Sequence, residues 1–262
     1  MDNFLKANKA WWNKATSVHS SSKLYGVEEF KKGKSNLNTI EIEELGDVKG
    51  KTLLHLQCHF GMGTISWARE GVVVTGVDLS DESIKLAKKL SDEVGIPADF
   101  ICSDVYSLPE VLDKKFDIVF TSYGVLAWLP DIKKWAKVVS HFLKEGGTFY
   151  IAEIHPLTNI FSKDFKITDS YFRQEPYIEE SGPDYTDEHI NIEGKTFEWT
   201  HTLGDIVSAL IGEGLKIEFL HEFPFTVYDQ FPGLLKEDGQ GYWRFKDQNI
   251  EIPLLFSLKA LK

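Results

Sequence analysis

The residues with the clearest capacity for chemistry are two acids and a glycine that follow short apolar segments. Asp78 and Asp104 each come directly after such a segment, and Gly61 lies in the turn after another. An Asp at a strand end accepts hydrogen bonds from both hydroxyls of a ribose, and a second one accepts the exocyclic amine of an adenine. A glycine turn that leads into a helix brings backbone N–H groups close to an anion. These residues predict a nucleoside site, with Leu79 and Val105 flanking the base.

The elements that must position these residues are alternating strands and helices. Five short segments rich in apolar and β-branched residues predict parallel strands that are covered on both faces. These segments are 51–57, 72–77, 98–102, 116–121 and 148–153. Apolar residues at three- and four-residue spacing, together with capping residues, predict helices between them. These helices are 64–70, 80–94 and 131–143.

The C-terminal part of the chain predicts how the sheet is completed. A helix is expected over 203–212, followed by strands over 215–220 and 252–260. Two strands after the last helix imply a hairpin, in which one strand runs antiparallel to the rest. The fold class is therefore α/β, a doubly wound seven-stranded mostly parallel sheet with an antiparallel C-terminal hairpin. Ligands bind beyond the carboxyl ends of such strands, where Asp78 and Asp104 are expected to meet.

Composition and charge exclude several classes of function. The 262 residues are 42% apolar and carry a net charge of -11, which repels phosphate backbones and anionic lipids. We therefore expect neither a nucleic-acid partner nor a membrane partner. The two cysteines, Cys58 and Cys102, have no CxxC spacing, so we expect small core residues rather than a disulfide or a thiolate metal site. No signal-peptide or membrane-spanning run is evident, and a cytoplasmic location is expected.

Four segments describe the expected organisation of the chain. Residues 1–48 form an N-terminal helical cap segment, and 49–156 form the core of the predicted sheet. Residues 157–200 show no helical or strand period and are predicted to be a lid insertion. Residues 201–262 complete the core. The lid contains seven acids and no Lys or Arg between Gln174 and Gly194.

The order and spacing of these motifs resemble those of class I S-adenosylmethionine-dependent methyltransferases, strongly over about residues 49–156 and moderately over 200–260. Five segments carry the resemblance: the first strand and glycine loop, the acidic ribose site, the adenine site, the fourth strand and the turn into the fifth. In this sequence they read Leu54-His-Leu-Gln-Cys-His-Phe-Gly61, Val77-Asp-Leu-Ser80, Ser103-Asp-Val105, Phe116-Asp-Ile-Val119 and Leu143-Lys-Glu-Gly-Gly147.

The resemblance implies S-adenosyl-L-methionine as cofactor and transfer of its methyl group to a nucleophile. The residues that it assigns to cofactor binding lie at the ends of the first four strands. They are Gln57, His59, Gly61, Asp78, Leu79, Asp104, Val105, Ser122 and Tyr123. A general base is needed only where the acceptor carries a proton at neutral pH, so the catalytic residue stays unknown, with His155 as a candidate base.

The glycine loop departs from the family pattern D-x-G-x-G-x-G. His55 stands at the acidic position, and Gln57 and His59 stand at the first two glycine positions. A side chain at position 59 crowds the methionine part of the cofactor unless the backbone there already accommodates a Cβ. We expect variant binding rather than its loss. Because His55 and His59 point differently and have no evident third ligand, no metal site is expected.

Five residues are candidates for contact with the acceptor, and each has a competing interpretation. The candidates are Tyr25, Trp128, His155, Trp199 and His201. His155 follows the fifth strand, where a base could reach an acceptor, but it could equally be a loop histidine bound to backbone ahead of Pro156. The aromatic residues could wall the acceptor site or simply pack in the core.

The predicted function is methyl transfer from S-adenosylmethionine to an unidentified small-molecule acceptor. One alternative is a cofactor-binding protein without transferase activity. Another is an NAD-dependent oxidoreductase, which the loop disfavours because Gly61-Met-Gly63 is followed by Ser66 where G-x-G-x-x-G requires glycine. Asp104 and the terminal hairpin favour the methyltransferase. The sequence leaves the acceptor, the methylated atom and the oligomeric state open.

Overall fold

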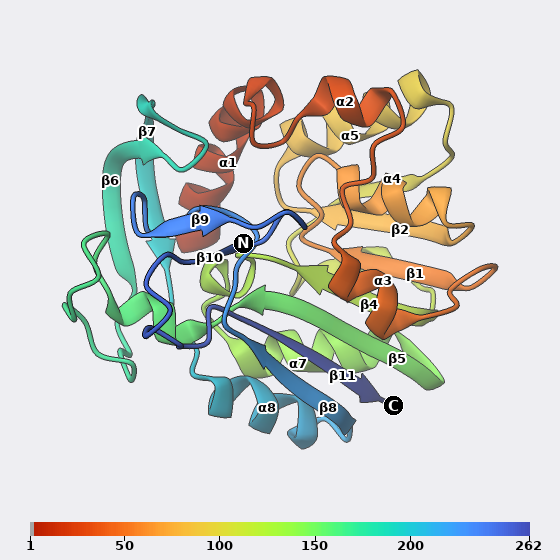
Figure 1. Ribbon diagram of the computed structural model, residues 1–262. Helices are drawn as coiled ribbons and strands as arrows, with labels where there is room; N and C mark the ends of the chain where they lie inside the picture. The colour runs from red at the N-terminus through yellow and green to blue at the C-terminus, as the bar shows by residue number, and fades with distance from the viewer. Residues whose placement is uncertain (1–2) are drawn as a thin grey trace.

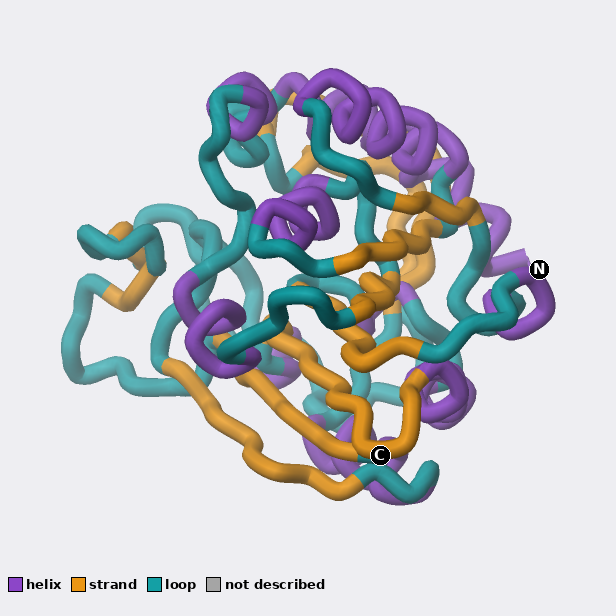
Figure 2. Tube along the Cα trace, turned by 90° about the vertical axis from the view of Figure 1, so that its right-hand side faces the viewer, coloured by secondary structure: helices purple, strands orange, loops and turns teal. Residues whose placement is uncertain are grey.

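The protein is built on one seven-stranded sheet with helices on both faces (Figures 1 and 2). A computed structural model describes residues 3–262, apart from the side chain of residue 188. The strand order is β3-β2-β1-β4-β5-β11-β8, and β11 is antiparallel to both of its neighbours. The strands are β1 (Thr52–Leu56), β2 (Val73–Asp78), β3 (Asp99–Cys102), β4 (Phe116–Ser122), β5 (Leu143–Ile154), β8 (Lys216–Phe223) and β11 (Leu255–Leu261). The predicted fold class is confirmed.

Burial on both faces explains why the parallel strands read as continuous apolar runs. Leu53 and Leu54 of β1 are both fully buried, although successive side chains of a strand point to opposite faces. Leu53 packs in the core beneath α3 and α4, whereas Leu54 packs in the core beneath α6, α7 and α8. The helices of the core are α4 (Met62–Arg69), α5 (Asp81–Val94), α6 (Leu108–Val111), α7 (Ile132–Phe142) and α8 (Leu203–Gly212).

Local capping fixes where the helix after β2 begins. The Ser80 side chain accepts a hydrogen bond from the backbone N–H of Ser83, 3.0 Å away, as expected of an N-cap residue. Gly95 ends the helix in a left-handed conformation that a Cβ would disfavour. The chain therefore leaves β2 at Asp78 and enters α5 within three residues, which keeps Asp78 at the sheet edge.

The N-terminal segment is helical, and its first helix packs against the β6–β7 hairpin while its third covers one face of the sheet. It contains α1 (Asn3–Ser21), α2 (Val27–Lys31) and α3 (Thr39–Leu45). The side chain of Asn8 in α1 pairs with the backbone of Phe197, donating to its carbonyl and accepting from its N–H at 2.8 Å each. This pair joins the first helix to a segment that lies 189 residues away in the sequence.

The lid segment 157–200 corrects the sequence prediction, because much of it is regular. It contains η2 (Pro156–Ile160) and an antiparallel hairpin of β6 (Tyr177–Asp184) and β7 (Asp187–Glu198). The hairpin has two register irregularities and a largely exposed β6, which obscure the alternation of apolar and polar residues. Contacts with α1 stabilise the hairpin, and these contacts are not visible in the local sequence pattern.

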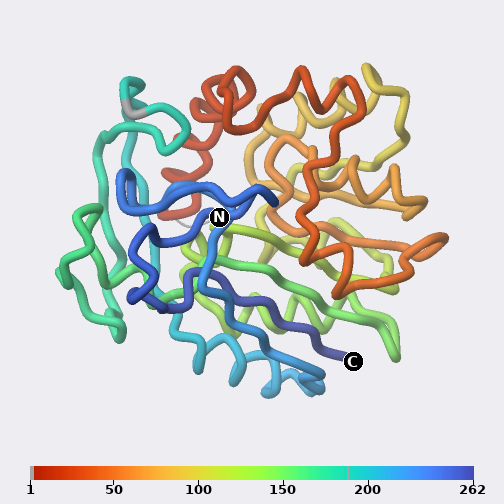
Figure 3. Tube along the Cα trace, viewed as in Figure 1, coloured from red at the N-terminus to blue at the C-terminus, as the bar shows by residue number. Residues whose placement is uncertain are grey.

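Three further expectations need correction. The C-terminal strands β8 and β11 pair directly, but they are not joined by a tight turn. The segment between them, residues 224–254, contains turns and a second small hairpin of β9 (Leu235–Glu237) and β10 (Trp243–Phe245) (Figure 3). The short helix α6 was not anticipated. Cys58 is buried, whereas Cys102 is exposed and is not a core residue. Among the described residues, no helix is long and apolar enough to cross a membrane.

Glu41 provides a test of how α3 is held. Its carboxylate accepts a hydrogen bond of 2.6 Å from the N–H of Asn38, and burial raises its pKa to about 7. The unfolded chain ionises this group near pH 4.5, so native-state stabilisation is present below that pH and is lost as the pH rises toward 7. Glu41→Gln keeps the capping interaction and removes the titration.

We expect the free energy of unfolding of the wild type, relative to Glu41→Gln, to fall by about 3 kcal/mol between pH 4.5 and pH 7.5. Urea titrations at several pH values measure this difference. The comparison cancels the opposing contributions of buried histidines. Parallel pH profiles for the two proteins would contradict the assignment.

Candidate functional site

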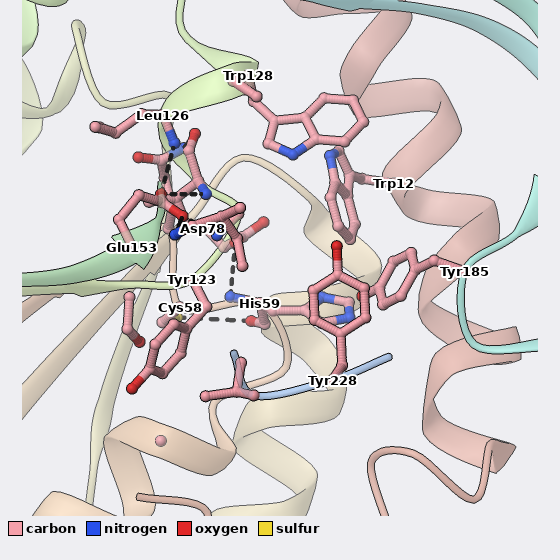
Figure 4. Close-up of a pocket in the computed structure, with 18 of the residues that line it drawn as sticks. Trp12, Cys58, His59, Asp78, Tyr123, Leu126, Trp128, Glu153, Tyr185 and Tyr228 are labelled. Carbon is pink, nitrogen blue, oxygen red and sulfur yellow. Dashed lines mark hydrogen bonds between the residues drawn. The ribbon is translucent and has the colours of Figure 1, made fainter. Parts of the chain in front are cut away.

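A cavity of about 1090 Å³ lies at the carboxyl edge of the sheet (Figure 4). The segments that follow β1 to β5 form its floor, and α1, the β6–β7 hairpin and residues between 227 and 243 contribute its walls. All nine residues predicted to bind the cofactor line this cavity. They are Gln57, His59, Gly61, Asp78, Leu79, Asp104, Val105, Ser122 and Tyr123. The structure thus brings them together, while their role in binding stays a prediction.

Asp78 is held at the centre of this floor by backbone groups. Its Oδ2 accepts from the N–H of His59 at 2.8 Å, and its Oδ1 accepts from the N–H of Ser80 at 2.9 Å. Burial raises the pKa of Asp78 to about 6, although these hydrogen bonds oppose the shift. Each carboxylate oxygen accepts more than one hydrogen bond, so Asp78 retains capacity for a pair of ligand hydroxyls.

The backbone conformation explains how the loop after β1 accommodates Gln57 and His59 where the family pattern has glycines. Gln57 and His59 have φ angles of 55° and 52°, in the left-handed region that favours glycine. The described chain has four such non-glycine residues, and three of them, Gln57, His59 and Tyr123, line the cavity. Strain of this kind costs about 1–3 kcal/mol per residue and concentrates at functional sites. The loop keeps the glycine conformation without the glycines.

Position 61 requires glycine both for its positive φ angle and for lack of space. Its φ is 80°, and a Cβ there would lie 2.7 Å from the ring of Phe100 and 2.8 Å from the Cβ of Ala87. Both neighbours belong to the packed layer between the sheet and α5. The loop after β1 therefore cannot move away from the sheet to admit a side chain at position 61.

A buried chain of hydrogen bonds connects the loop to the cap. His59 Nε2 lies 3.0 Å from His19 Nδ1, and His19 Nε2 lies 2.9 Å from Asp184 Oδ2. His59 Nδ1 lies 3.1 Å from the hydroxyl of Ser83. Burial, followed by His19, lowers the pKa of His59 well below its usual value. The Asp184 carboxylate accepts from His19 Nε2, so the remaining nitrogen of His19 is the one that faces His59.

This chain of hydrogen bonds explains how position 59 accommodates a side chain. The ring of His59 packs against Trp12, Tyr25 and His19, with ring centroids 5.1 to 5.4 Å apart, instead of filling the space next to Asp78. The side chain therefore serves to dock α1 onto the loop. Burial raises the pKa of Asp184, but hydrogen bonds from His19 and Thr186 outweigh it, and the net pKa is lowered.

Asp104 occupies the corresponding position after β3. It is buried, and its Oδ1 accepts from the N–H of Ser107 at 3.0 Å. Leu79 and Val105 line the cavity beside it, as the predicted base site requires. Asp104 itself lines the cavity, and a carboxylate has acceptor capacity beyond this one hydrogen bond for a donor such as an exocyclic amine.

Glu153 is a site residue that sequence reasoning missed. Its carboxylate is buried at the end of β5 and accepts from the N–H groups of Gly124, Val125 and Leu126, the latter two at 2.8 and 3.2 Å. Burial raises its pKa. The signal in the sequence that could have identified Glu153 is an acidic residue at the C-terminal end of an apolar strand. Glu153 shapes the segment after β4 and lines the cavity.

The structure separates the acceptor candidates into two groups. Tyr25, Trp128, Trp199 and His201 line the cavity, whereas His155 does not. His155 Nδ1 accepts from the N–H of Leu157, and its Nε2 lies 2.9 Å from Glu222 on β8. This placement contradicts the expectation that His155 reaches an acceptor and supports the alternative of a loop histidine bound to backbone.

Three further aromatic residues, Trp12, Tyr185 and Tyr228, line the cavity besides the acceptor candidates. The ring centroid of Trp12 lies 5.0 Å from that of the candidate Trp128, and those of Tyr185 and Tyr228 are 6.3 Å apart. Figure 4 shows these four rings on one side of Asp78, with Tyr185 and Tyr228 beside His59 and with Trp12 and Trp128 above them. Tyr228 comes from the excursion between β8 and β11, so no local pattern placed it here. In the described part of the chain, no group of three potential metal ligands is present.

A family model described as a methyltransferase domain matches residues 54–151 of this chain. The matched segment contains the loop after β1, Asp78 and Asp104, and the sheet has the strand order described above. Residues 54–151 are thus similar to a methyltransferase domain. The matched segment ends before Glu153 and excludes α1, the β6–β7 hairpin and the excursion before β11, which together form most of the cavity wall.

Curated relatives match this chain over part of their length. The chain is 28% identical over 155 residues to a ubiquinone biosynthesis O-methyltransferase of Chromobacterium violaceum, covering 59% of this chain and 62% of that protein. It is 31% identical over 117 residues to the protein of the same name from Coxiella burnetii, covering 44% and 48%. The match thus spans less than two thirds of either relative.

Solved structures share the fold of this protein over most of the chain. An S-adenosylmethionine-dependent methyltransferase from Clostridium acetobutylicum superposes with a TM-score of 0.58 at 17% identity, covering 93% of this chain and 94% of that one. One from Mesorhizobium loti gives 0.55 at 20% identity, covering 84% and 94%. These similarities establish the fold.

Asp184 allows the connection between cap and loop to be tested. Asp184→Asn removes the charged acceptor from a buried histidine, so we expect the free energy of unfolding to fall by about 1–3 kcal/mol. Asp187→Asn is the matched control, because Asp187 is exposed three positions further along the same hairpin. Urea unfolding followed by tryptophan fluorescence measures both. Equal losses in the two variants would show that the contact with His19 adds no stability.

Proposed function

We propose that this protein transfers a methyl group from S-adenosylmethionine to a small-molecule acceptor. The observation that carries the proposal is the placement of Asp78, held by two backbone N–H groups with acceptor capacity left, on the cavity floor within the matched domain. Asp104 supports it from the next strand. A nicotinamide dehydrogenase is not favoured, because both the family match and the sheet order point to the methyltransferase.

The residues present fit the cofactor. Gln57 Oε1 is buried without a hydrogen-bond partner, while Gln57 Nε2 donates to the carbonyl of Val125 at 2.8 Å. An unpaired buried acceptor is costly and fits a ligand that carries an ammonium group, such as the methionine part of the cofactor. Asp78 would hold the ribose hydroxyls, and Asp104 would hold the adenine amine.

The chemistry is a displacement at carbon. S-adenosylmethionine supplies a methyl group on a positively charged sulfur, so the acceptor's lone pair forms the new bond while the carbon–sulfur bond breaks and its electrons stay on sulfur. The protein's contribution is to orient the acceptor and exclude water. The rings of Trp12, Trp128, Tyr185 and Tyr228 provide an aromatic part of the cavity wall.

A small acceptor fits the walls of the cavity. The N-terminal segment 1–48 and the lid 157–200 act in this proposal as a cap over the acceptor, because both contribute to the lining. The net charge of -11 disfavours a nucleic acid. We also propose a cytoplasmic location, which the free thiols of Cys58 and Cys102 favour.

Asp78→Asn tests the ribose contact. We expect it to weaken binding of adenosylhomocysteine at least tenfold, a loss of about 1.4 kcal/mol, because a charged acceptor becomes a neutral amide. The wild-type affinity is expected to fall as the pH drops below about 6, where Asp78 takes up a proton, and the variant is expected to lack this dependence. Isothermal titration calorimetry measures both.

Asp92→Asn is the control, since Asp92 is exposed on α5. An affinity of Asp78→Asn equal to that of the control would remove the ribose role. Binding of the nucleoside without any turnover across a broad acceptor panel would support the alternative of a cofactor-binding protein without transferase activity.

A further inference from the structure

The lining of the cavity is strongly acidic. Eight carboxylic acids line it, against two lysines, Lys23 and Lys34, which are both exposed. Among the described lining residues there is no arginine. The acids are Glu41, Asp78, Asp104, Glu153, Glu179, Asp184, Glu198 and Glu237. Such a field disfavours an acceptor that carries a carboxylate or a phosphate and favours a cation.

Most of the buried acids are already satisfied by the protein. Asp78 and Glu153 accept from backbone N–H groups, and Asp184 accepts from His19. Glu198 differs, because no Lys or Arg of the described chain lies within ion-pair distance of its carboxylate. Glu198 is partly buried, and Glu179, which follows its pairing partner Tyr177 by two residues on the facing strand, is exposed. Burial, followed by the charge of Glu179, raises the pKa of Glu198 to about 7. A carboxylate in a cavity wall without a counter-ion favours a ligand that supplies the positive charge.

Aromatic rings line the same cavity as Glu198. The residue after it, Trp199, donates from its N–H to the carbonyl of Ala127 at 2.7 Å, which joins this end of the hairpin to the segment that holds Trp128. Burial, followed by the charges of Glu153 and Glu198, raises the pKa of Tyr228 to about 12. Tyr228 lies beside Tyr185 and faces the space bounded by Trp12 and Trp128 (Figure 4). Aromatic faces attract cations that lie within about 6 Å of the ring centroid.

The position of Glu198 outside the matched domain indicates that it serves the acceptor rather than the cofactor. The sulfonium of the cofactor is also a cation, so aromatic rings alone would fit either group. Glu179 and Glu198 come from the β6–β7 hairpin, which lies beyond the matched methyltransferase domain at 54–151. Asp78 and Asp104 lie within that domain. Glu198 therefore belongs to the wall that differs from the common domain, where acceptor selectivity is expected.

We propose that the acceptor is an amine, whose ammonium group binds between Glu198 and the rings of Tyr228 and Trp128, and whose nitrogen receives the methyl group. This inference rests on the proposed function and specifies its substrate class. An ammonium must lose a proton before its nitrogen has a lone pair. The Glu198 carboxylate takes up that proton, and the methylated nitrogen leaves with the positive charge that the sulfur gave up.

Three ligands with one phenyl ring and different charge test the proposal. They are phenethylamine, phenethyl alcohol and phenylacetate, added to the protein saturated with adenosylhomocysteine. Trp128 and Trp199 line the cavity, so quenching of tryptophan fluorescence reports binding without turnover. We expect the ammonium to bind at least about tenfold more tightly than the alcohol, and the carboxylate to bind most weakly. Adenosylhomocysteine formation with phenethylamine and S-adenosylmethionine is the second readout.

Glu198→Gln is the decisive variant, and Glu180→Gln is its control on the same hairpin. Glu180 is exposed and does not line the cavity. We expect Glu198→Gln to lose about tenfold in phenethylamine affinity and to leave the alcohol unchanged, whereas Glu180→Gln behaves as the wild type. Thermal unfolding and adenosylhomocysteine binding confirm that both variants are folded.

Two outcomes would overturn the amine proposal while leaving the methyltransferase intact. One is equal or tighter binding of the alcohol or the carboxylate, and the other is no saturable binding of phenethylamine at about 10 mM in a protein that binds adenosylhomocysteine. Loss of the amine preference in Glu180→Gln as well as in Glu198→Gln would also overturn it. Failure of the wild type to bind adenosylhomocysteine would instead contradict the proposed function itself.

Discussion

The site depends on buried carboxylates whose charge is balanced by backbone N–H groups rather than by cations. Asp78 orients the loop after β1 through His59, and Glu153 orients the segment after β4 through Val125 and Leu126. For those N–H groups to point at a carboxylate, the backbone must turn sharply, and the left-handed conformations of this floor are the consequence. The carboxylates thus hold a preformed cavity floor, which reduces the ordering cost of binding.

The wall of the cavity is assembled from both ends of the chain. His19 of α1 contacts Asp184 of the hairpin and His59 of the loop, so the cap and the floor share one hydrogen-bonded network. At the other end of the hairpin, Trp199 donates from its N–H to the carbonyl of Ala127 at 2.7 Å. The acceptor space is therefore bounded by segments that hold one another in place, and their residues set its charge.

Sequence reasoning was most successful where the local pattern and the tertiary environment agree. The strands of the parallel sheet are buried on both faces, so continuous apolar runs in the sequence predicted them correctly. The acids at the ends of these strands lie on one edge of the sheet, as expected. It failed for the β6–β7 hairpin, whose exposed face and bulges hide the strand period, and for His155, whose side chain turns toward Glu222. Proximity in sequence to a strand end does not determine which way a side chain points.

The sequence by itself determined the sheet, its order of strands and helices, and the position of Asp78 and Asp104 at its carboxyl edge, because burial and capping act over a few residues. Only the tertiary structure decided what surrounds the acceptor. Glu198 and Tyr228 meet in the same wall although they are distant in the chain, and Glu153 gains its role from N–H groups of another loop. Contacts of this kind depend on how whole elements pack, and a one-dimensional pattern carries no record of that packing.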